Sequence, residues 1–357
     1  MSLLTKYGKV VPGKAIIADK FGDVDFQGGT LSNETNITDL QDKISPQQIV
    51  TVAQVGGEYS LIQDAIDSIT DAGSGKIYAV LVYPGVYDER LTLKDYVNII
   101  AVDPFETLIS KGITDNGANV HCSLKINIGV GTSVSYDNGV RISGSSSDVF
   151  IEGNIKGGLG SGDHSTDNGV YISGGGSLMI VGNVTGGAGL DYPGYGFQNS
   201  ASTLKIQGNV TAGVKYGNHS LNYTKGSNPT TIVTDGTILG QELRLESNGG
   251  QALFKRCKII GTPGDAVEGH PSYTSEAHFE NISIEVQDGD YHGIYAYALN
   301  LILKNVTIVH TASGTGKSIY SNQALDVKCL NVWANRDLDA NVTNLIAGGF
   351  TYDTDVE

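Results

Sequence analysis

The sequence predicts an all-β protein: a right-handed parallel β-helix of about ten coils, with an α-helix capping its first end and a short N-terminal extension. Three observations predict this class: short segments of alternating apolar residues, abundant glycine, and an internal repeat of about two dozen residues. Alternation with a period of two indicates strands that bury one face. Frequent glycine indicates tight corners between such strands.

The composition fits one long solenoid. The chain has 357 residues, of which 48 are glycine and only 8 are proline, so the turns are made mainly with glycine. Apolar residues form 39% of the chain, which is enough for a core and unlike a disordered protein. A solenoid of this length can be a single domain because each coil packs only on its neighbours.

An irregular repeat runs from about residue 115 to residue 345. Residues 137–144 (DNGVRISG) recur as residues 167–174 (DNGVYISG). A second repeated segment carries asparagine at positions 22 to 30 residues apart: Asn154, Asn183, Asn209, and later Asn281, Asn305 and Asn331. This spacing fits one β-helix coil of three short strands better than a propeller blade or a helical pair. Coils stacked at ~4.8 Å give a rod on the order of 50 Å long.

The repeated asparagines have two interpretations. Four of them precede x-Ser/Thr and could be read as glycosylation acceptors: Asn183, Asn209, Asn281 and Asn305. We favour a structural role, because asparagine tolerates left-handed corners and stacked asparagine side chains can hydrogen-bond between coils.

The first end of the rod is predicted to be closed by a helix. Ser60 and Gln63 fit a capping box, with Ser60 at the N-cap. An apolar helix face follows at i, i+3, i+4 and i+7, made by Ile62, Ala65, Ile66 and Ile69. Strands are then expected at 77–83, 90–93 and 97–102. Such a helix would cover core side chains and unpaired backbone of the first coil.

Three regions follow from these patterns. Residues 1–50 show no sustained period and are predicted to be an anchoring extension. Residues 51–347 form the β-helix, and residues 348–357 form a C-terminal tail. We expect the extension either to lie on the rod or to bind a partner, because its short apolar pieces bury little surface alone.

Charge and targeting signals exclude several classes. The net charge of −15 is spread along the chain without a basic cluster, so we predict no nucleic-acid binding. No apolar run approaches the ~20 residues needed to cross a membrane, so no membrane insertion is expected. Residues 1–11 lack the apolar core of a secretion signal, which indicates synthesis in a cytoplasm.

The three cysteines, Cys122, Cys257 and Cys329, show neither a disulfide framework nor a CxxC spacing. Cys257 and Cys329 lie in strand-like segments, which predicts buried thiols. We expect no metal site and no cofactor.

The start of the predicted rod resembles a known family. Residues 57–67 (GEYSLIQDAID), 83–89 (YPGVYDE) and 98–100 (NII) resemble the beginning of pectin methylesterases. They are equally similar to the wider pectate-lyase-like superfamily of right-handed β-helices, which includes bacteriophage tailspikes and other virion proteins. The match covers about 50 residues, the capping helix and first coil, and implies the fold.

The resemblance does not extend to the residues that carry the family's pectin chemistry. Pectin methylesterases use Asp and Gln side chains and an Arg closely followed by Trp. Here the only tryptophan, Trp333, precedes Arg336. The Gln-Asp pairs, such as that at Gln287, do not lie at the expected distance after the Pro-Gly turn. The calcium-binding Asp cluster of pectate lyases and the acidic motifs of polygalacturonases are also absent.

Two acidic groups are candidates for catalysis. Glycoside hydrolysis needs two carboxyl groups roughly 5 to 9.5 Å apart. Asp265 and Glu268, with His270 nearby, form the first candidate pair, and Asp288 and Asp290 form the second. The alternative is that all four are solvated corner residues of an acidic protein, and both interpretations stay open.

Aromatic side chains in two segments are candidates for carbohydrate binding or for contacts between identical subunits: Tyr192, Tyr195 and Phe197, and Tyr291, Tyr295 and Tyr297. Exposed rings beside hydrogen-bonding groups bind sugars. The same rings could be buried between side-by-side rods of a homotrimer.

These observations leave three hypotheses. The first is a bacteriophage virion structural protein, such as a tail spike, fibre or capsid decoration rod. It would be homotrimeric, assembled in the host cytoplasm and joined to other virion proteins through residues 1–50, and it would contact a host-surface polysaccharide or receptor. The second is a polysaccharide depolymerase, a glycosidase or lyase, on the same fold. The third is a bacterial surface adhesin.

Overall fold

The computed structural model describes residues 15–18, 24–27, 48–129, 138–158, 167–187, 194–215, 218–219, 222–269, 275–297, 299–321, 325–346 and 350–352. The chain divides into two compact units, Met1–Gln47 and Gln48–Glu357. In the first unit, strands β1 (Ala15–Ala18) and β2 (Val24–Gln27) form an antiparallel pair.

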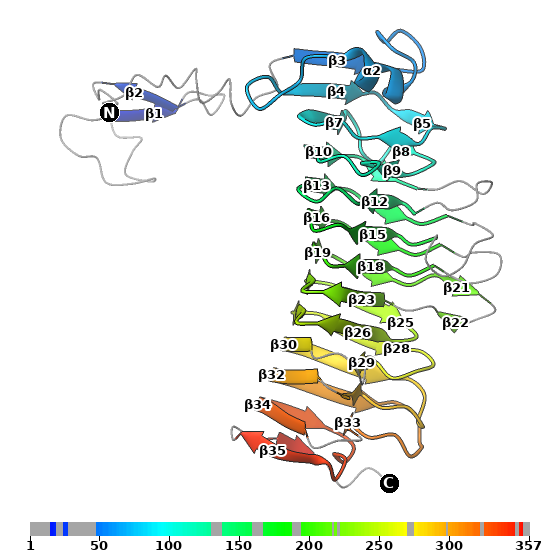
Figure 1. The fold of residues 1–357 in the computed structure, drawn as a ribbon, viewed down its shortest axis with the longest axis vertical. Coiled ribbons are helices and arrows are strands. Elements are labelled where there is room, and N and C mark those ends of the chain that lie inside the picture. The colour runs from blue at the N-terminus through cyan, green and yellow to red at the C-terminus, as the bar shows by residue number, and fades with distance from the viewer. Residues whose placement is uncertain are drawn as a thin grey trace. The chain divides into compact units, whose positions relative to one another are not determined.

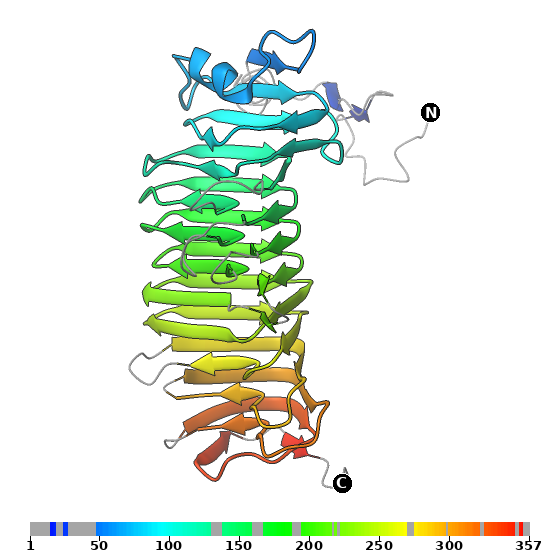
Figure 2. The same cartoon turned by 90° about the vertical axis from the view of Figure 1, so that its right-hand side faces the viewer.

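The second unit is a right-handed parallel β-helix, which confirms the predicted fold class (Figures 1 and 2). Each coil supplies strands to three faces, which we call A, B and C. Among the described residues, faces A and B form one sheet of 22 strands, because three long strands pass through the corner between them. Face C is a separate sheet of ten strands, and neighbouring coils pair in parallel on all three faces.

The strands of face A are β3 (Gln48–Val52), β4 (Tyr78–Val82), β7 (Val97–Ala101), β10 (His121–Lys125), β13 (Asp148–Glu152), β16 (Ser177–Val181), β19 (Thr203–Gln207), β24 (Thr230–Thr234), β27 (Gln251–Lys255) and β35 (Val342–Ile346). The strands of face B are β5 (Gly85–Tyr87), β8 (Thr107–Ile109), β11 (Asn127–Ile128), β14 (Ile155–Lys156), β17 (Val184–Thr185), β20 (Val210–Thr211), β25 (Thr237–Gly240), β28 (Lys258–Gly261) and β36 (Phe350–Tyr352). The long strands that span both faces are β30 (Ser275–Val286), β32 (Leu299–His310) and β34 (Leu325–Ala334).

The strands of face C are β6 (Leu91–Thr92), β9 (Ile113–Thr114), β12 (Val140–Ile142), β15 (Val170–Ser173), β18 (Phe197–Ser200), β23 (Asn222–Ser227), β26 (Leu243–Asn248), β29 (Val267–Gly269), β31 (Ile294–Tyr295) and β33 (Ile319–Tyr320). Strands β21 (Val214–Lys215) and β22 (Asn218–His219) form a separate two-stranded antiparallel sheet.

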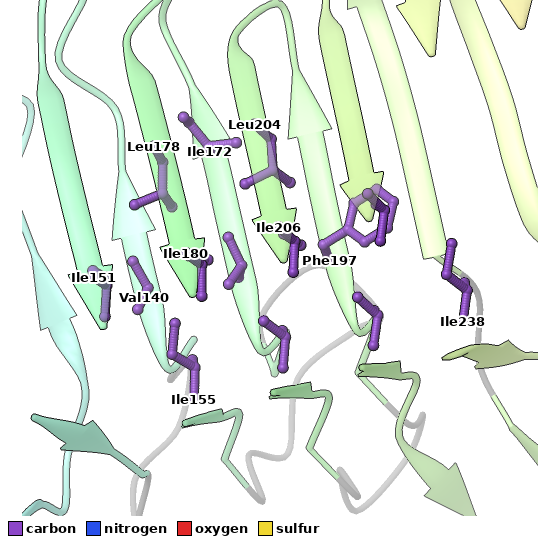
Figure 3. Close-up of a cluster of buried hydrophobic side chains, with 14 of the residues drawn as sticks. Val140, Ile151, Ile155, Ile172, Leu178, Ile180, Phe197, Leu204, Ile206 and Ile238 are labelled. Atoms are coloured by element: carbon purple, nitrogen blue, oxygen red, sulfur yellow. The ribbon is translucent and has the colours of Figure 1, made fainter. Parts of the chain in front are cut away.

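The core consists of columns of apolar side chains that repeat from coil to coil. On face A, Ile151 pairs in register with Ile180, which pairs with Ile206. All three are buried and point into the same interior (Figure 3). Since the side chains of one column come from different coils, each coil stabilises both of its neighbours.

The corner between faces A and B carries the predicted asparagine ladder. The backbone N–H of Asn209 donates to Oδ1 of Asn183 at 3.2 Å, and the side-chain amide of Asn331 donates to Oδ1 of Asn305 at 3.0 Å. Stacked asparagines therefore hydrogen-bond between coils, as predicted. The left-handed backbone is found at Asn281, Asn305 and Asn331, with φ of 55°, 52° and 55°.

The earlier asparagines differ, and the prediction of a left-handed corner is wrong for them. In each of those coils a glycine precedes the asparagine, and two of these glycines take the unusual backbone conformation: Gly182 with φ of 150° and Gly208 with φ of 142°. A Cβ on Gly208 would lie 2.3 Å from the carbonyl oxygen of Gly182, so the stacked backbones leave no space for a side chain.

Helix α2 (Ile62–Ser68) covers the first end of the rod, but its N-terminus is capped differently from the prediction. The N-cap residue is Leu61, and no side chain at that position makes a capping hydrogen bond. Instead the two carboxylate oxygens of Glu89 accept hydrogen bonds from the backbone N–H groups of Ile62 and Gln63, at 2.7 and 2.8 Å. A carboxylate satisfies two amide groups at the positive end of the helix, which a serine hydroxyl does not.

The predicted apolar helix face is confirmed, because Ile62, Ala65, Ile66 and Ile69 are buried. Strand β3 crosses the predicted boundary at residue 50 and pairs with β4. At the other end, β36 pairs with β34, so the last coil includes residues 350–352 of the predicted tail.

All three cysteines are free and buried, which confirms the burial predicted for Cys257 and Cys329. Burial raises the pKa of the Cys122 thiol to about 12 and that of Cys329 to about 11, so neither forms a thiolate at neutral pH. Within the described ranges, no helix has the length and hydropathy of a membrane span.

Candidate functional site

Four side chains form a column on the outer surface of face C. Arg244 pairs in register with Glu268, Glu268 with Tyr295, and Tyr295 with Tyr320. The preceding residue of each strand is buried in the core, so these four residues point outward. Because neighbouring parallel strands lie ~4.8 Å apart, the four side chains lie directly next to one another along the rod. We call these four residues the acid–aromatic column.

The acidic end of the column surrounds one guanidinium group. Nη2 of Arg244 lies 2.8 Å from Oε2 of Glu268 and also contacts Oε1 of Glu242, while Nη1 lies 3.6 Å from Oε1 of Glu246. Glu242 is only 7% exposed. Burial, together with a hydrogen bond to the neighbouring Glu268, raises the pKa of Glu242 well above its usual range. Glu242 therefore holds a proton more readily than an ordinary surface carboxylate.

Asp265 lies in the corner before β29, beside this acidic end. Its Oδ1 accepts a hydrogen bond from the backbone N–H of His292 in the next coil. Burial raises the pKa of Asp265 to about 6, against the opposing effect of that hydrogen bond, and the charge of Glu268 raises it further. The predicted pair Asp265 and Glu268 thus lies on one surface, with Asp265 in a drier environment and Glu268 paired with Arg244.

The other end of the column is aromatic. The ring of His292 stacks on Tyr320 with centroids 4.3 Å apart, and Tyr295 stacks on Tyr297, also at 4.3 Å. Tyr295 meets Tyr320 edge to face at 4.8 Å. Its hydroxyl and that of Tyr297 are hydrogen-bonded at 2.6 Å. All four rings are half-buried, so their orientations are fixed while part of each surface stays accessible.

The imidazole of His292 is held in its neutral form. Its Nδ1 accepts a hydrogen bond from the backbone N–H of Lys317 at 2.8 Å, which leaves the proton on Nε2. Burial lowers the pKa of His292. The ring therefore belongs to the aromatic cluster as a neutral group at neutral pH.

The other predicted aromatic residues do not all reach this surface. Tyr291 is 40% exposed and lies next to His292 in the chain. Tyr195 is half-buried in the corner before β18, on an earlier coil. Phe197 is fully buried and points into the core (Figure 3), so its prediction as a surface contact is wrong. In strand β18 the alternation places Phe197 on the inner side. Tyr192, like the predicted histidine at 270, lies outside the described residues.

The second predicted acidic pair has a structural role in this arrangement. Oδ1 of Asp288 accepts a hydrogen bond from the N–H of Asp290 at 3.1 Å. Oδ1 of Asp290 accepts from the backbone N–H of Thr315 at 3.1 Å and from its hydroxyl at 3.3 Å. Asp290 thus joins the loops of neighbouring coils, and Asp288 stabilises the turn that carries Asp290.

Glu242, Arg244 and Tyr320 were not among the predicted site residues. A signal for two of them was present, because Arg244, Glu268, Tyr295 and Tyr320 follow one another at intervals of 24, 27 and 25 residues, within the coil length. Aligning the coils by this interval would have placed the four residues in one column. Glu242 lies two residues before Arg244, and its place in the site could be recognised only from the three-dimensional packing.

The outer column continues toward the N-terminal coils but changes character. Arg141 lies with its guanidinium 5.6 Å from the ring centre of Tyr171, its register partner. The next residue in register, Gln198, is only 1% exposed and accepts a hydrogen bond from Asn168. The accessible part of the column is therefore interrupted at Gln198.

A groove of about 510 Å³ runs along face B, far from these residues in the coil order. Its wall includes Asn127, Asn154 and Asn183. The side-chain oxygens of these residues already accept ladder hydrogen bonds, so they offer less to a ligand than the column does. Across the part of the chain that the structure describes, no group of three His, Cys, Asp or Glu side chains is arranged to hold a metal ion.

Comparisons with known proteins add little to this picture. No protein-family model matches the chain, and no curated protein matches it. Among solved structures, the chain is similar to ORF18 of Geobacillus virus E2, with 12% sequence identity and a TM-score of 0.31. The similarity covers 88% of this chain and 68% of that one, and it is too low for an argument about function.

Proposed function

We propose that this chain is a bacteriophage virion structural protein whose β-helix binds a host-surface glycan through the acid–aromatic column. The observation that carries the glycan-binding proposal is the register that aligns Arg244, Glu268, Tyr295 and Tyr320 on one face. Tyrosine rings provide flat apolar surfaces for sugar rings, and the adjacent carboxylates provide hydrogen-bond acceptors for hydroxyls.

The virion assignment is supported by the plan of the chain. A regular solenoid follows a separate compact unit, Met1–Gln47, which is small enough to act as an attachment segment. We propose that residues 1–50 join the rod to other virion proteins and that three copies associate into a trimer. We also propose that the chain belongs to the pectate-lyase-like β-helices, on the basis of the fold and the residues of the capping helix and first coil.

Location in the particle is tested by mass spectrometry of purified phage. The chain is expected in the particle, and a variant lacking residues 1–47, which keeps strand β3, is expected to fold but to be absent from it. Normal incorporation of the shortened protein would contradict the role of the extension. Absence of the full-length chain would contradict the virion assignment.

Glycan binding is tested on an array of bacterial surface polysaccharides. Tyr295→Ala and Tyr320→Ala are each expected to weaken binding about tenfold, because each removes a stacking surface. Tyr171→Ala is the matched control, since Tyr171 lies in the same outer column beyond the buried Gln198. Equal losses from all three substitutions would contradict the proposed site.

One observation favours depolymerase activity as a second candidate. Asp265 has a raised pKa of about 6 and lies near Glu268, and a carboxyl group that protonates readily close to a second carboxyl group is the arrangement a glycosidase needs. Glu242 fits less well, because it is only 7% exposed and shares the guanidinium of Arg244 with Glu268. Release of reducing sugar from the host polysaccharide, lost in Asp265→Asn, would support the enzyme, and no release by the wild type would remove it.

A further inference from the structure

Negative charge predominates around the accessible rings. The carboxylates near the column and its aromatic cluster are Glu246, Glu268, Asp265, Asp290, Asp337 and Asp339. Lys225, the register partner of Glu246, also lies there and has its own interaction within the protein. Three further cations of the described residues accompany the carboxylates: Arg244, Lys317 and Arg336. A ligand that stacks on these rings therefore enters a negative field.

The three cations are already engaged. Arg244 is shared among three glutamates, and Nζ of Lys317 lies 3.8 Å from Oδ2 of Asp337. Arg336 donates hydrogen bonds to the backbone carbonyls of Gly289, Ala312 and Gly316. Since these donors are used within the protein, they are poorly placed to bind an acidic ligand.

The rings themselves favour a cation. A positive group within about 6 Å of a tyrosine ring is attracted by its electron-rich face. Tyr295 packs on both Tyr297 and Tyr320, and its register partner on the other side is Glu268. A sugar stacked on Tyr295 would thus hold its substituents between a ring face and a carboxylate, where an ammonium group is stabilised and a carboxylate is repelled.

We propose that the column selects glycans that contain amino sugars with free ammonium groups and that it rejects acidic polysaccharides. This selectivity rests on the proposed glycan binding at the same residues. The glycan lies along the rod, because the column extends over four coils, a length of roughly 14 Å at ~4.8 Å per step. An extended pyranose chain advances by a similar distance per sugar, so successive sugars meet successive coils.

The experiment titrates the full-length chain by calorimetry with three linear hexamers of equal length: glucosamine, N-acetylglucosamine and galacturonic acid. These probes are cationic, neutral and anionic. We expect the glucosamine hexamer to bind about tenfold more tightly than the N-acetylated one, and the galacturonic acid hexamer not to bind. A glucosamine dimer should bind more weakly than the hexamer, because it reaches fewer coils.

Two variants separate the site from general attraction to an acidic protein. Glu268→Gln is expected to lower the ratio of the two affinities, glucosamine hexamer over N-acetylated hexamer, from about ten to about one. Glu152→Gln, on face A, is the matched control, because it removes one half-exposed, lysine-paired carboxylate elsewhere and should change neither affinity. Circular dichroism confirms that each variant keeps its fold.

The outcomes test the charge selectivity separately from the proposed glycan binding. If the N-acetylated hexamer binds and the glucosamine hexamer binds no more tightly, the charge selectivity is wrong while glycan binding stands. Binding of the galacturonic acid hexamer, equal effects of the two glutamine substitutions, or equally tight binding of hexalysine would also overturn the selectivity. If no sugar binds and Tyr295→Ala changes nothing, glycan binding itself fails.

Discussion

The earlier and later coils of the rod turn the corner between faces A and B in two different ways. In the earlier coils a glycine and an asparagine share the corner, as at Gly182 and Asn183. In the later coils one left-handed residue suffices, and the strands β30, β32 and β34 continue through it. Both corners carry the same asparagine ladder. A repeat can therefore conserve a hydrogen-bond pattern while changing the backbone that presents it.

The two regions also differ on face C. The acid–aromatic column lies on the coils whose corners are the left-handed residues Asp235, Arg256, Asn281 and Asn305. In the earlier coils the corresponding outer position includes the buried Gln198. The acid–aromatic column thus lies on the later type of coil and is separated by the buried Gln198 from Arg141 and Tyr171 of the earlier coils.

The largest effect is expected from filling an earlier corner. Gly208→Ala would place a Cβ 2.3 Å from the carbonyl oxygen of Gly182, in a backbone conformation that L-residues rarely adopt. We expect a loss of about 4 kcal/mol in the free energy of unfolding, measured in urea. A loss below about 1 kcal/mol would show that the earlier coils can shift apart and that the two corner types are less distinct.

Acid should weaken the later coils through His310. This residue is 5% exposed, and within the described chain neither ring nitrogen has a hydrogen-bond partner. Burial lowers the pKa of His310 to about 4, and the charges of Arg336 and His292 contribute. Its usual value is 6.5, so the unfolded chain binds the proton more readily between pH 6.5 and 4.

The stability that neutral His310 allows is therefore complete above pH 6.5 and is lost as the pH falls toward 4. We expect the protonation of His310 to lower the free energy of unfolding by about 3 kcal/mol at pH 4 relative to pH 7. It is measured as the difference between the wild type and His310→Leu across that range. Parallel stability curves for the two proteins would show that His310 is protonated as easily in the folded state as in the unfolded one.

A smaller effect distinguishes the two ladders directly. Asn305→Ala loses two ladder hydrogen bonds and forces alanine into a left-handed conformation, for an expected cost of about 2 kcal/mol. Asn183→Ala loses ladder bonds without that strain and should cost about 1 kcal/mol. Glycine should be better tolerated than alanine at 305 only. If glycine and alanine were equivalent at both positions, backbone strain would not separate the two corners.

The smallest effect is expected at the junction of the two regions. Arg256 occupies a left-handed corner with φ of 52° and binds Asp235, with Nη2 2.8 Å from Oδ2. Arg256→Asn would extend the later ladder by one coil, from Asn281 back to position 256, since asparagine accepts this backbone conformation. The pair it removes is exposed, so we expect no measurable change in the urea midpoint. A clear loss would show that this ion pair, rather than the corner geometry, holds the junction.

Sequence patterns predicted the repeating parts of this molecule and missed contacts that depend on the stacking. The buried positions of Ile62 and Ile66 follow from helical spacing, and the coil length follows from recurring asparagines. The cap supplied by Glu89 lies 26 and 27 positions from its partners, beyond any local motif. The role of Phe197 was misjudged because an aromatic residue beside glycines was assigned to a loop rather than to the inner side of a short strand.

Within the site, Asp265 and Glu268 were found because acidic residues three positions apart are visible in the sequence. Arg244 was missed because its relation to Glu268 depends on the register of β26 against β29. A one-residue shift in that register would have turned one of the two side chains into the core. Knowing the local pattern of each strand is thus insufficient until the coils are aligned.

Arg336, near the end of the rod, fixes loops of coils that precede it in the chain. It follows β34 in the chain, yet its guanidinium holds the loops that precede β31 and β33, where the rings of His292 and Tyr320 begin. During synthesis those rings emerge before the side chain that fixes their supporting loops. A chain that ends before Arg336 would consequently carry Tyr295 and Tyr320 without the contacts that fix their supporting loops, so the aromatic cluster takes its final arrangement only in molecules whose last coils are complete.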